Sequence, residues 1–401
     1  MFTQFKKFKF NHRNIFLNIL LASLTVLPLT TIEKKVEIGL RSRLISNCFN
    51  NNAIEENYYP EELIVDSSHL VNKVAISQDG SIMATAVYDE IKLWNIHNQD
   101  SSADREIITS QNERLIKSLI EHNKQENSEK IDRDLLGNIN SLAISHNENT
   151  NETIVASLGQ GKQQFAVWRI TDISVDPEFT LLNKSNSVNL GEIKSITISP
   201  NHKYVAIGSN NRILVWEINT DSIEKTKIDL ELDRNITALT FSYDNETLIL
   251  GSDNGEISIL SVASNPNLLP KKKDKNTNKP ITSLTISPNE NIISVFDDVG
   301  ILWKNLPRLS PQRRLELKGN NNQITSVVIS PNNNNLVIGR FGGIIEFWNL
   351  YSQKRLHTCQ IPKDLISTTP NVALSVNNQQ QVKVITYGSQ VINFWQLSYQ
   401  Q

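Results

Sequence analysis

The chain has 401 residues, enough for one large domain, two ordinary domains or one array of repeats. Its 40 basic and 42 acidic side chains leave a net charge of −2, which gives no general attraction to nucleic acid or to an anionic membrane surface. The two cysteines, Cys48 and Cys359, are too few for a disulfide scaffold and have no metal-binding or redox spacing. We expect both to be free, with a disulfide between them as the alternative in an exported protein.

The first residues differ in composition from the rest of the chain. An apolar run at 15–29 follows four basic side chains, Lys6, Lys7, Lys9 and Arg13. That order is typical of a secretory signal peptide, and the run is shorter than the roughly 20 residues that a membrane-spanning helix needs. No Ala-x-Ala cleavage site follows it, so an uncleaved anchor stays open as the alternative.

This segment decides the expected location of the protein. We predict a signal peptide or membrane anchor at 1–32 and a linker at 33–62. The protein is then exported, or associated with a membrane through residues 15–29, with a cytoplasmic location as the alternative.

Seven units of similar sequence follow. Each begins with a strand of alternating apolar residues that ends on a serine, and turns at Ser-Pro-Asn or an equivalent, where Pro presets φ and Asn tolerates left-handed geometry. A more apolar second strand, a tight turn and a third strand complete the unit. The units begin at 72–80, 140–148, 194–202, 237–245, 282–290, 325–333 and 371–379.

Every tryptophan of the chain lies at the end of the third strand of a unit, and the fourth unit has a leucine there instead. From the second unit onward these strand ends recur every 43 to 48 residues, a period typical of propeller blades. The large indole suits a layer between stacked sheets. We expect blade-core roles for Trp94, Trp168, Trp216, Leu260, Trp303, Trp348 and Trp395.

At these repeats, over about residues 63 to 397, the chain resembles the WD-repeat family in a divergent, bacterial-like form with an N-terminal signal or anchor segment. The resemblance implies an all-β fold, a seven-bladed β-propeller of four-stranded blades at 63–401. One blade cannot bury both of its apolar faces alone, whereas stacking between neighbours around an axis buries both.

The chain departs from the family pattern after the tryptophans. The acidic residue that the family places there survives at Glu217 alone, and the Gly-His pair is missing. The family's buried relay of Trp, Ser, His and Asp hydrogen bonds is therefore expected to be absent or partial. The fold depends less on this relay than on apolar burial.

Closing the ring requires a strand from the other end of the chain, because an open ring leaves two sheet edges unpaired. The last unit ends with its third strand at 391–397, and residues 61–66 precede the first unit without a blade of their own. We predict that Leu63 to Val65 form the outer strand of the seventh blade.

Two segments interrupt the repeats. An insertion at 98–136 separates blades 1 and 2, and within 101–134 the apolar residues fall at helical spacing, with charged residues on the other faces. We predict an amphipathic helix that packs on the blade edge or docks a partner, with disorder as the third alternative. The basic run at 270–279 lacks interleaved aromatic residues and is interpreted as a solvated linker, so no nucleic-acid partner is expected.

Catalytic patterns are missing from the sequence. The seven histidines have no metal-ligand spacing, and no GxSxG, phosphate-loop or EF-hand pattern occurs. The acidic groups in GSDNG at 251–255 and in Asp297-Asp298 fall where a unit needs its second turn. We therefore predict no catalytic residue, metal or cofactor.

The turns between second and third strands should crowd one rim of the ring, where loops on a rigid scaffold commonly bind partners. Tyr, Phe and Arg usually dominate interface energy, and Phe341 beside Arg340 is the sharpest candidate, either exposed or folded inward. The candidate partner-binding residues are Tyr88, Arg212, Asp253, Asp297, Arg340, Phe341 and Tyr387.

These features predict a non-catalytic scaffold for unidentified protein partners, built as a monomeric ring. The alternative is an exported propeller enzyme or small-molecule binder that uses the central channel. Convergent histidines and carboxylates would favour that alternative, and the few acidic turn residues supply little material for it.

Overall fold

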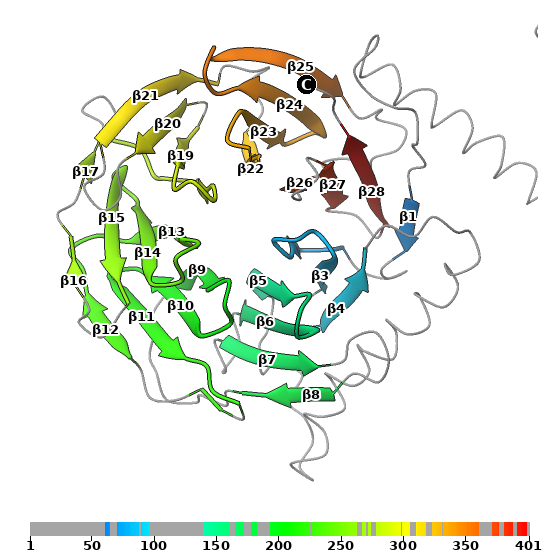
Figure 1. The fold of residues 1–401 in the computed structure, drawn as a ribbon, viewed down its shortest axis with the longest axis vertical. Helices are drawn as coiled ribbons and strands as arrows, with labels where there is room; N and C mark the ends of the chain where they lie inside the picture. The colour runs from blue at the N-terminus through cyan, green and yellow to red at the C-terminus, as the bar shows by residue number, and fades with distance from the viewer. Residues whose placement is uncertain are drawn as a thin grey trace, which may run out of the picture.

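A computed structural model of the chain shows a ring of antiparallel β-sheets around a central opening (Figure 1). The structure describes residues 61–64, 70–87, 90–96, 139–159, 165–171, 178–182, 193–220, 222–223, 227–262, 267–269, 272–273, 278–297, 299–304, 310–317, 323–330, 332–360, 371–376, 381–387 and 391–398. The predicted N-terminal segment at 1–32, the linker up to residue 60 and the predicted helix within 101–134 lie outside these residues.

The described strands form seven sheets, which we number in chain order. The first has three described strands, β2 (Lys73–Ile76), β3 (Ile82–Val87) and β4 (Glu90–Asn95). The second contains β5 (Ile139–Asn147), β6 (Glu152–Gly159), β7 (Phe165–Thr171) and β8 (Glu178–Leu181). The third contains β9 (Ile193–Ile198), β10 (Tyr204–Ser209), β11 (Arg212–Glu217) and β12 (Ile228–Glu231).

The remaining four sheets repeat this arrangement. The fourth contains β13 (Ile236–Phe241), β14 (Thr247–Ser252), β15 (Glu256–Ser261) and two short strands, β16 (Asn267–Leu268) and β17 (Lys272–Lys273). The fifth contains β18 (Ser283–Ile286), β19 (Ile292–Phe296), β20 (Val299–Lys304) and β21 (Ser310–Glu316). The sixth contains β22 (Ile324–Ile329), β23 (Asn335–Arg340), β24 (Ile344–Asn349) and β25 (Lys354–Gln360). The seventh contains β26 (Asn371–Val376), β27 (Gln381–Tyr387), β28 (Val391–Ser398) and β1 (Glu61–Ile64).

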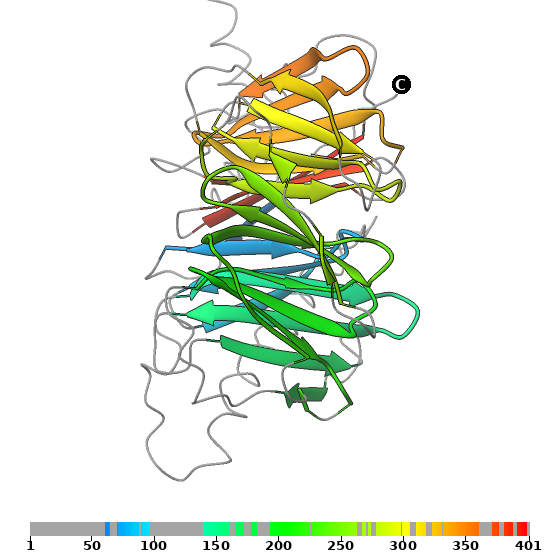
Figure 2. The same cartoon turned by 90° about the vertical axis from the view of Figure 1, so that its left-hand side faces the viewer.

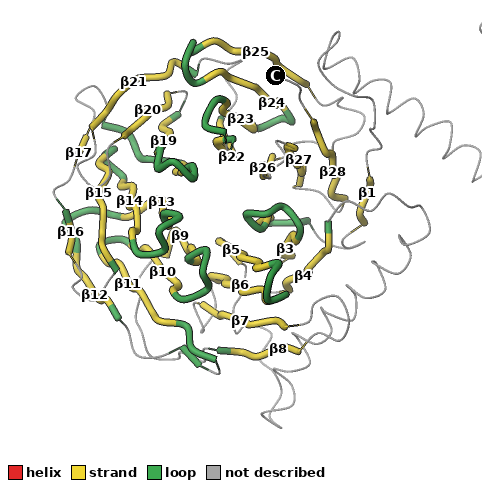
Figure 3. Tube along the Cα trace, in the orientation of Figure 1, coloured by secondary structure: helices red, strands yellow, loops and turns green. Residues whose placement is uncertain are grey.

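The first strand of a sheet lies near the opening and the last lies at the outer edge of the ring (Figure 1). In the side view the strands cross the short dimension of the ring, so that turns lie on its two faces (Figure 2). The part of the chain that the structure describes contains no helix (Figure 3), and hence none that is long and apolar enough to cross a membrane. The all-β propeller architecture is thus confirmed.

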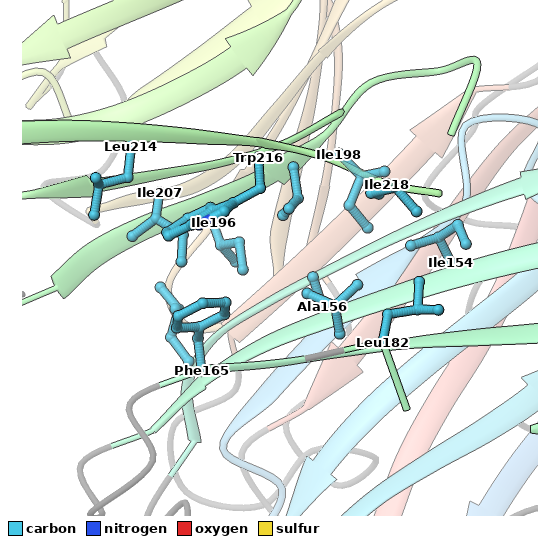
Figure 4. Packing of buried hydrophobic residues seen from close by; sticks show 13 residues of the cluster. Ile154, Ala156, Phe165, Leu182, Ile196, Ile198, Ile207, Leu214, Trp216 and Ile218 are labelled. Atoms are coloured by element: carbon cyan, nitrogen blue, oxygen red, sulfur yellow. The ribbon is translucent and has the colours of Figure 1, made fainter. Parts of the chain in front are cut away.

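Apolar clusters fill every joint between neighbouring sheets. The largest lies between the second and third sheets, where the rings of Phe165 and Trp216 pack with centroids 4.8 Å apart (Figure 4). Equivalent clusters join each further pair, including the first sheet to the second and the seventh to the first. Each sheet therefore buries both faces against its neighbours, which an isolated blade cannot do.

The predicted tryptophan positions lie in these joints. Trp94, Trp168, Trp216, Leu260 and Trp303 are buried, and Trp348 is half-buried. The indole N–H of Trp94 donates to Thr85 Oγ1 at 3.0 Å, and that of Trp303 donates to Ser294 Oγ at 2.9 Å. The expected partial relay is confirmed in these two sheets as a single hydrogen bond from each indole to the second strand. The side chain of Trp395 lies outside the described residues.

The serine at the end of each first strand explains the sequence repeat. Ser199 Oγ accepts the N–H of Tyr204 at 2.8 Å, and Ser330 Oγ accepts that of Asn335 at 3.0 Å, so one hydroxyl caps each turn. The Asn of Ser-Pro-Asn accepts a backbone N–H two residues on, as Asn201 does from Lys203. The left-handed residue is the next one along, at Gly80, His202, Asn245, Glu290 and Asn333, so the expectation of left-handed Asn in Ser-Pro-Asn is wrong by one position.

The predicted closing strand is confirmed. β1 pairs with β28 in antiparallel register, with Leu63 opposite Ile392, and completes the seventh sheet. The strand covers Glu61–Ile64, two residues earlier at its start than the prediction.

Cys359 corrects the expectation of free cysteines. It lies on β25 with 3% of its surface exposed, inside the cluster between the sixth and seventh sheets, and it is disulfide-bonded. Spacing in the sequence could not indicate this, because the two cysteines of the chain lie over 300 positions apart. Cys48 lies outside the described residues.

Candidate partner-binding turns

The turns between second and third strands lie at the ends of the sheets opposite the serine turns. We call them the rim turns; those described in full are at 210–211, 253–255 and 341–343. Tyr88 lies outside the described residues. The other six candidate residues are described, and the structure gives them different environments.

Arg212 is half-exposed and lies at the start of β11. Its Nε donates to Asp229 Oδ1 on β12 at 2.5 Å, and its Nη2 donates to the other carboxylate oxygen. This two-point contact fixes the guanidinium plane across two strands of one sheet. Because Arg212 is already paired with Asp229 inside the sheet, its guanidinium is less available to a binding partner.

Two rim aspartates are also bound internally. Asp253 Oδ2 accepts the amide of Asn235 at 2.8 Å, within the fourth sheet. Asp297 adopts a left-handed φ of 45° and its carboxylate pairs with Lys279. Both are turn residues, as the sequence predicts.

Arg340 is folded inward, which removes it from the exposed rim. None of its side-chain surface is exposed, and its Nε lies 3.1 Å from Glu346 Oε2. Its Nη2 donates to the backbone oxygen of Leu317, in the segment that follows the fifth sheet. Burial of a guanidinium requires such partners, so Arg340 joins two sheets and does not await a ligand.

Glu346 holds this arrangement together and was missed by sequence reasoning. The carboxylate is 1% exposed and also accepts from Arg355 Nη1 and from the indole N–H of Trp348, each at 3.1 Å. A glutamate between apolar residues of a third strand, two positions before the tryptophan, is the available sequence signal.

Phe341 is exposed, unlike its neighbour. It has 37% of its surface in solvent, and its backbone N–H donates to Gln323 O at 2.8 Å. Gly342 and Gly343 follow with φ of 85° and 77°, a geometry that glycine adopts without strain. An aromatic side chain is therefore presented on a turn whose base is fixed by buried Arg340.

Tyr387 also departs from the rim prediction. It is half-buried at the end of β27 and packs on the cluster that joins the seventh sheet to the first. Burial raises the pKa of its hydroxyl to about 12. Its surroundings are those of a core residue.

On the opposite face, the serine turns surround the central opening, and those at β2–β3 and β13–β14 face each other across it (Figure 3). Burial raises the pKa of Tyr243 on one turn, and the nearby side chain of Gln78 on the other turn acts in the opposite direction. This contact narrows that mouth of the opening. Neither residue was predicted, because the two are 165 positions apart.

The chemistry of the described residues gives no metal centre, since no group of three or more His, Cys, Asp or Glu side chains among them could hold an ion. The buried charges are instead used between sheets, as at Arg340.

Comparison with known proteins agrees with the geometry. The family model described as "WD domain, G-beta repeat" matches residues 184–217 and 311–349. The first match contains β9 to β11 of the third sheet, and the second contains most of β21 of the fifth sheet and β22 to β24 of the sixth. The chain is a WD-repeat β-propeller.

One curated relative of this WD-repeat propeller is "Autophagy-related protein 21" of Vanderwaltozyma polyspora, 34% identical over 111 residues. The match spans 25% of this chain and 26% of the relative, about a quarter of each. It is a likeness between parts of two proteins.

Proposed function

We propose that this WD-repeat propeller is a non-catalytic scaffold that binds protein partners through the rim turns, with Phe341 at the centre of the contact. The observation that carries the proposal is an exposed aromatic side chain on a turn anchored by a fully buried ion pair. Rigid aromatic side chains contribute most to interface energy, because they bury a large area at a low entropic cost.

A contact across the opening favours the rim over the central channel. Tyr243 and Gln78 approach each other across one mouth, so a small-molecule site in the channel would have less room there. The alternative of an exported enzyme or small-molecule binder therefore ranks second.

The proposed test is copurification of partners with the full-length protein from its own cells, with Phe341→Ala and Tyr351→Ala as matched variants. Tyr351 is 59% exposed on another turn of the same sheet, so it controls for the loss of an exposed aromatic side chain. We expect stoichiometric protein partners with the natural chain and with Tyr351→Ala, and their loss with Phe341→Ala. Equal recovery with all three would contradict the rim proposal.

We further propose that the ring has seven blades, the first sheet being a blade like the other six. Its three described strands repeat the common pattern, and apolar clusters pack it against both neighbours. The ring is proposed to be monomeric, since this closure uses the chain's own β1.

Export, or anchoring through residues 15–29, is proposed for the N-terminal segment. The disulfide at Cys359 supports it, because disulfides persist in oxidising compartments. Recovery of the intact N-terminus in the soluble cytosol would contradict this.

A further inference from the structure

A cluster of charged and titratable side chains lies at one end of the joint between the second and third sheets. We call Glu152, Arg169, His202 and His146 the Glu152 cluster. Glu152 Oε1 lies 3.1 Å from Arg169 Nε and 3.4 Å from His202 Nδ1. Arg169 also donates from Nη1 to the backbone oxygen of Thr220, and so reaches from the second sheet to the third.

His202 is held rigidly in this cluster. It is 6% exposed and takes the left-handed position of its serine turn, with a φ of 62°. The turn itself is closed by the His202 N–H, which donates to Ser199 O at 2.9 Å. The imidazole of His202 is therefore positioned by a type of turn that the chain repeats in other sheets.

The two ring nitrogens of His202 have different surroundings. Nδ1 can donate to Glu152, whereas Nε2 is buried and has no hydrogen-bond partner among the described residues. A neutral ring leaves only a lone pair at Nε2. Protonation adds an N–H there without an acceptor, and leaving a buried donor unpaired is costly.

Charges around the ring oppose protonation as well as favour it. Burial lowers the pKa of His202; Glu152 on β6 acts in the opposite direction, while His146 on β5 and Arg169 on β7 lower it further. His146 Nδ1 lies 2.8 Å from Thr153 Oγ1, and adjacent Lys203 is paired with Glu217 at 3.5 Å. The Glu152 carboxylate, which would pair with a protonated His202, is thus already neutralised by Arg169.

We propose that His202 makes the joint between the second and third sheets acid-sensitive, so that the end of the joint at His202 loosens when its imidazole is protonated. The neighbouring apolar core, with Phe165 against Trp216, keeps the two sheets together. Acid therefore opens the joint at its His202 end and leaves the propeller closed.

The direction of the pH effect follows from the lowered pKa. Below the ordinary histidine value of about 6.5 the unfolded or open form binds more protons than the closed form. Stability of the joint is present above that pH and is lost as the pH falls toward the lower pKa of the closed form. Each pH unit within this window corresponds to about a tenfold change in the opening equilibrium.

The chain itself supplies the conservative variant. Asn occupies the same turn position at Asn245 and Asn333, with φ of 66° and 61°, so His202→Asn keeps the backbone geometry and removes the titration. His357→Asn is the matched control, because His357 is an exposed histidine on β25.

The experiment is backbone hydrogen exchange on the full chain at about pH 7 and about pH 5, corrected for the intrinsic rate. We expect the amides of Thr153 and Tyr204 to lose protection on acidification by several-fold in the natural chain and in His357→Asn, but not in His202→Asn. The same acid response in His202→Asn would overturn the proposal.

A second measurement keeps the test decisive if His202→Asn folds poorly. A direct NMR titration of the natural chain should give His202 a pKa below about 6.5, and Glu152→Gln should lower that pKa further. A value at or above 6.5 in the natural chain, or a rise in Glu152→Gln, would overturn the proposal.

Discussion

Two joints of the ring are built from different chemistry. Between the second and third sheets, the chain runs continuously and the contact is mainly apolar, with Phe165 against Trp216. Between the seventh and first sheets, where the two ends of the propeller meet, a buried lysine crosses the joint. Lys383 Nζ donates to the backbone oxygens of Gly80 and Ile96, each at 2.5 Å.

The two kinds of contact differ in how precisely they fix the position of one sheet against the next. Apolar burial stabilises contact but tolerates small shifts, whereas hydrogen bonds fix one arrangement. Ser375 Oγ adds a bond to Ser77 O at 3.3 Å across the same joint. The closing joint, which no short connection aligns, is therefore fixed by buried hydrogen bonds as well as by apolar contact.

The largest expected effect comes from breaking β1. Adjacent residues of an antiparallel strand point their N–H groups to opposite sides, so only one of Glu62→Pro and Leu63→Pro removes a bond to β28. We expect one variant to lose the single cooperative melting transition and the other to retain most of it. Thermal melts of the two full-length variants check this. Two melts like that of the natural chain would mean that closure does not depend on β1.

A smaller effect is expected at the apolar joint. Trp216→Ala should lower the free energy of unfolding by about 3 to 5 kcal/mol, because it leaves a cavity opposite Phe165. Denaturant unfolding measures it, and exposed Tyr351→Ala, expected within about 0.5 kcal/mol of the natural chain, is the control. A loss as small as that of the control would show that this joint does not depend on the aromatic pair.

The smallest expected effect is a pH dependence of the free energy of unfolding, caused by Lys383 at the closing joint. Burial lowers the pKa of Lys383 to about 8, with Asp79 acting in the opposite direction. The folded form then binds fewer protons than the unfolded form between about 8 and the usual lysine value of about 10.4. The free energy of unfolding should therefore rise across this window, by up to about 3 kcal/mol.

Lys383→Met should remove that rise, and denaturant unfolding at a series of pH values tests it. Lys203→Met is a suitable control, because Lys203 is half-exposed and paired at the surface. An unchanged slope in Lys383→Met would assign the pH dependence to another group.

The propeller could be predicted from sequence because its information is local. The serine turns, the apolar second strands and the tryptophans each lie within one unit, and the closing strand followed from counting strands. The left-handed turn position was placed one residue early, because Asn tolerates that geometry but here accepts a hydrogen bond instead.

The candidate site was harder to predict, because burial of a turn residue depends on the neighbouring sheet. Arg340 and Phe341 are adjacent, yet one reaches Glu346 and Leu317 in the interior and the other reaches solvent. Tyr387 lies at a strand end like a rim residue but meets the first sheet. The disulfide at Cys359 likewise depends on a contact far from it in sequence.

The pairing of β1 with β28 also sets an order for biosynthesis. Glu61 emerges from the ribosome before its partner Phe394, which lies 333 positions later in the chain. Each sheet from the second to the sixth can form from neighbouring residues as it is translated, whereas β1 must wait until β28 has been made. Until then the strand edge that it offers is open to other chains. The closing strand therefore remains unpaired while the six sheets between it and its partner are being made.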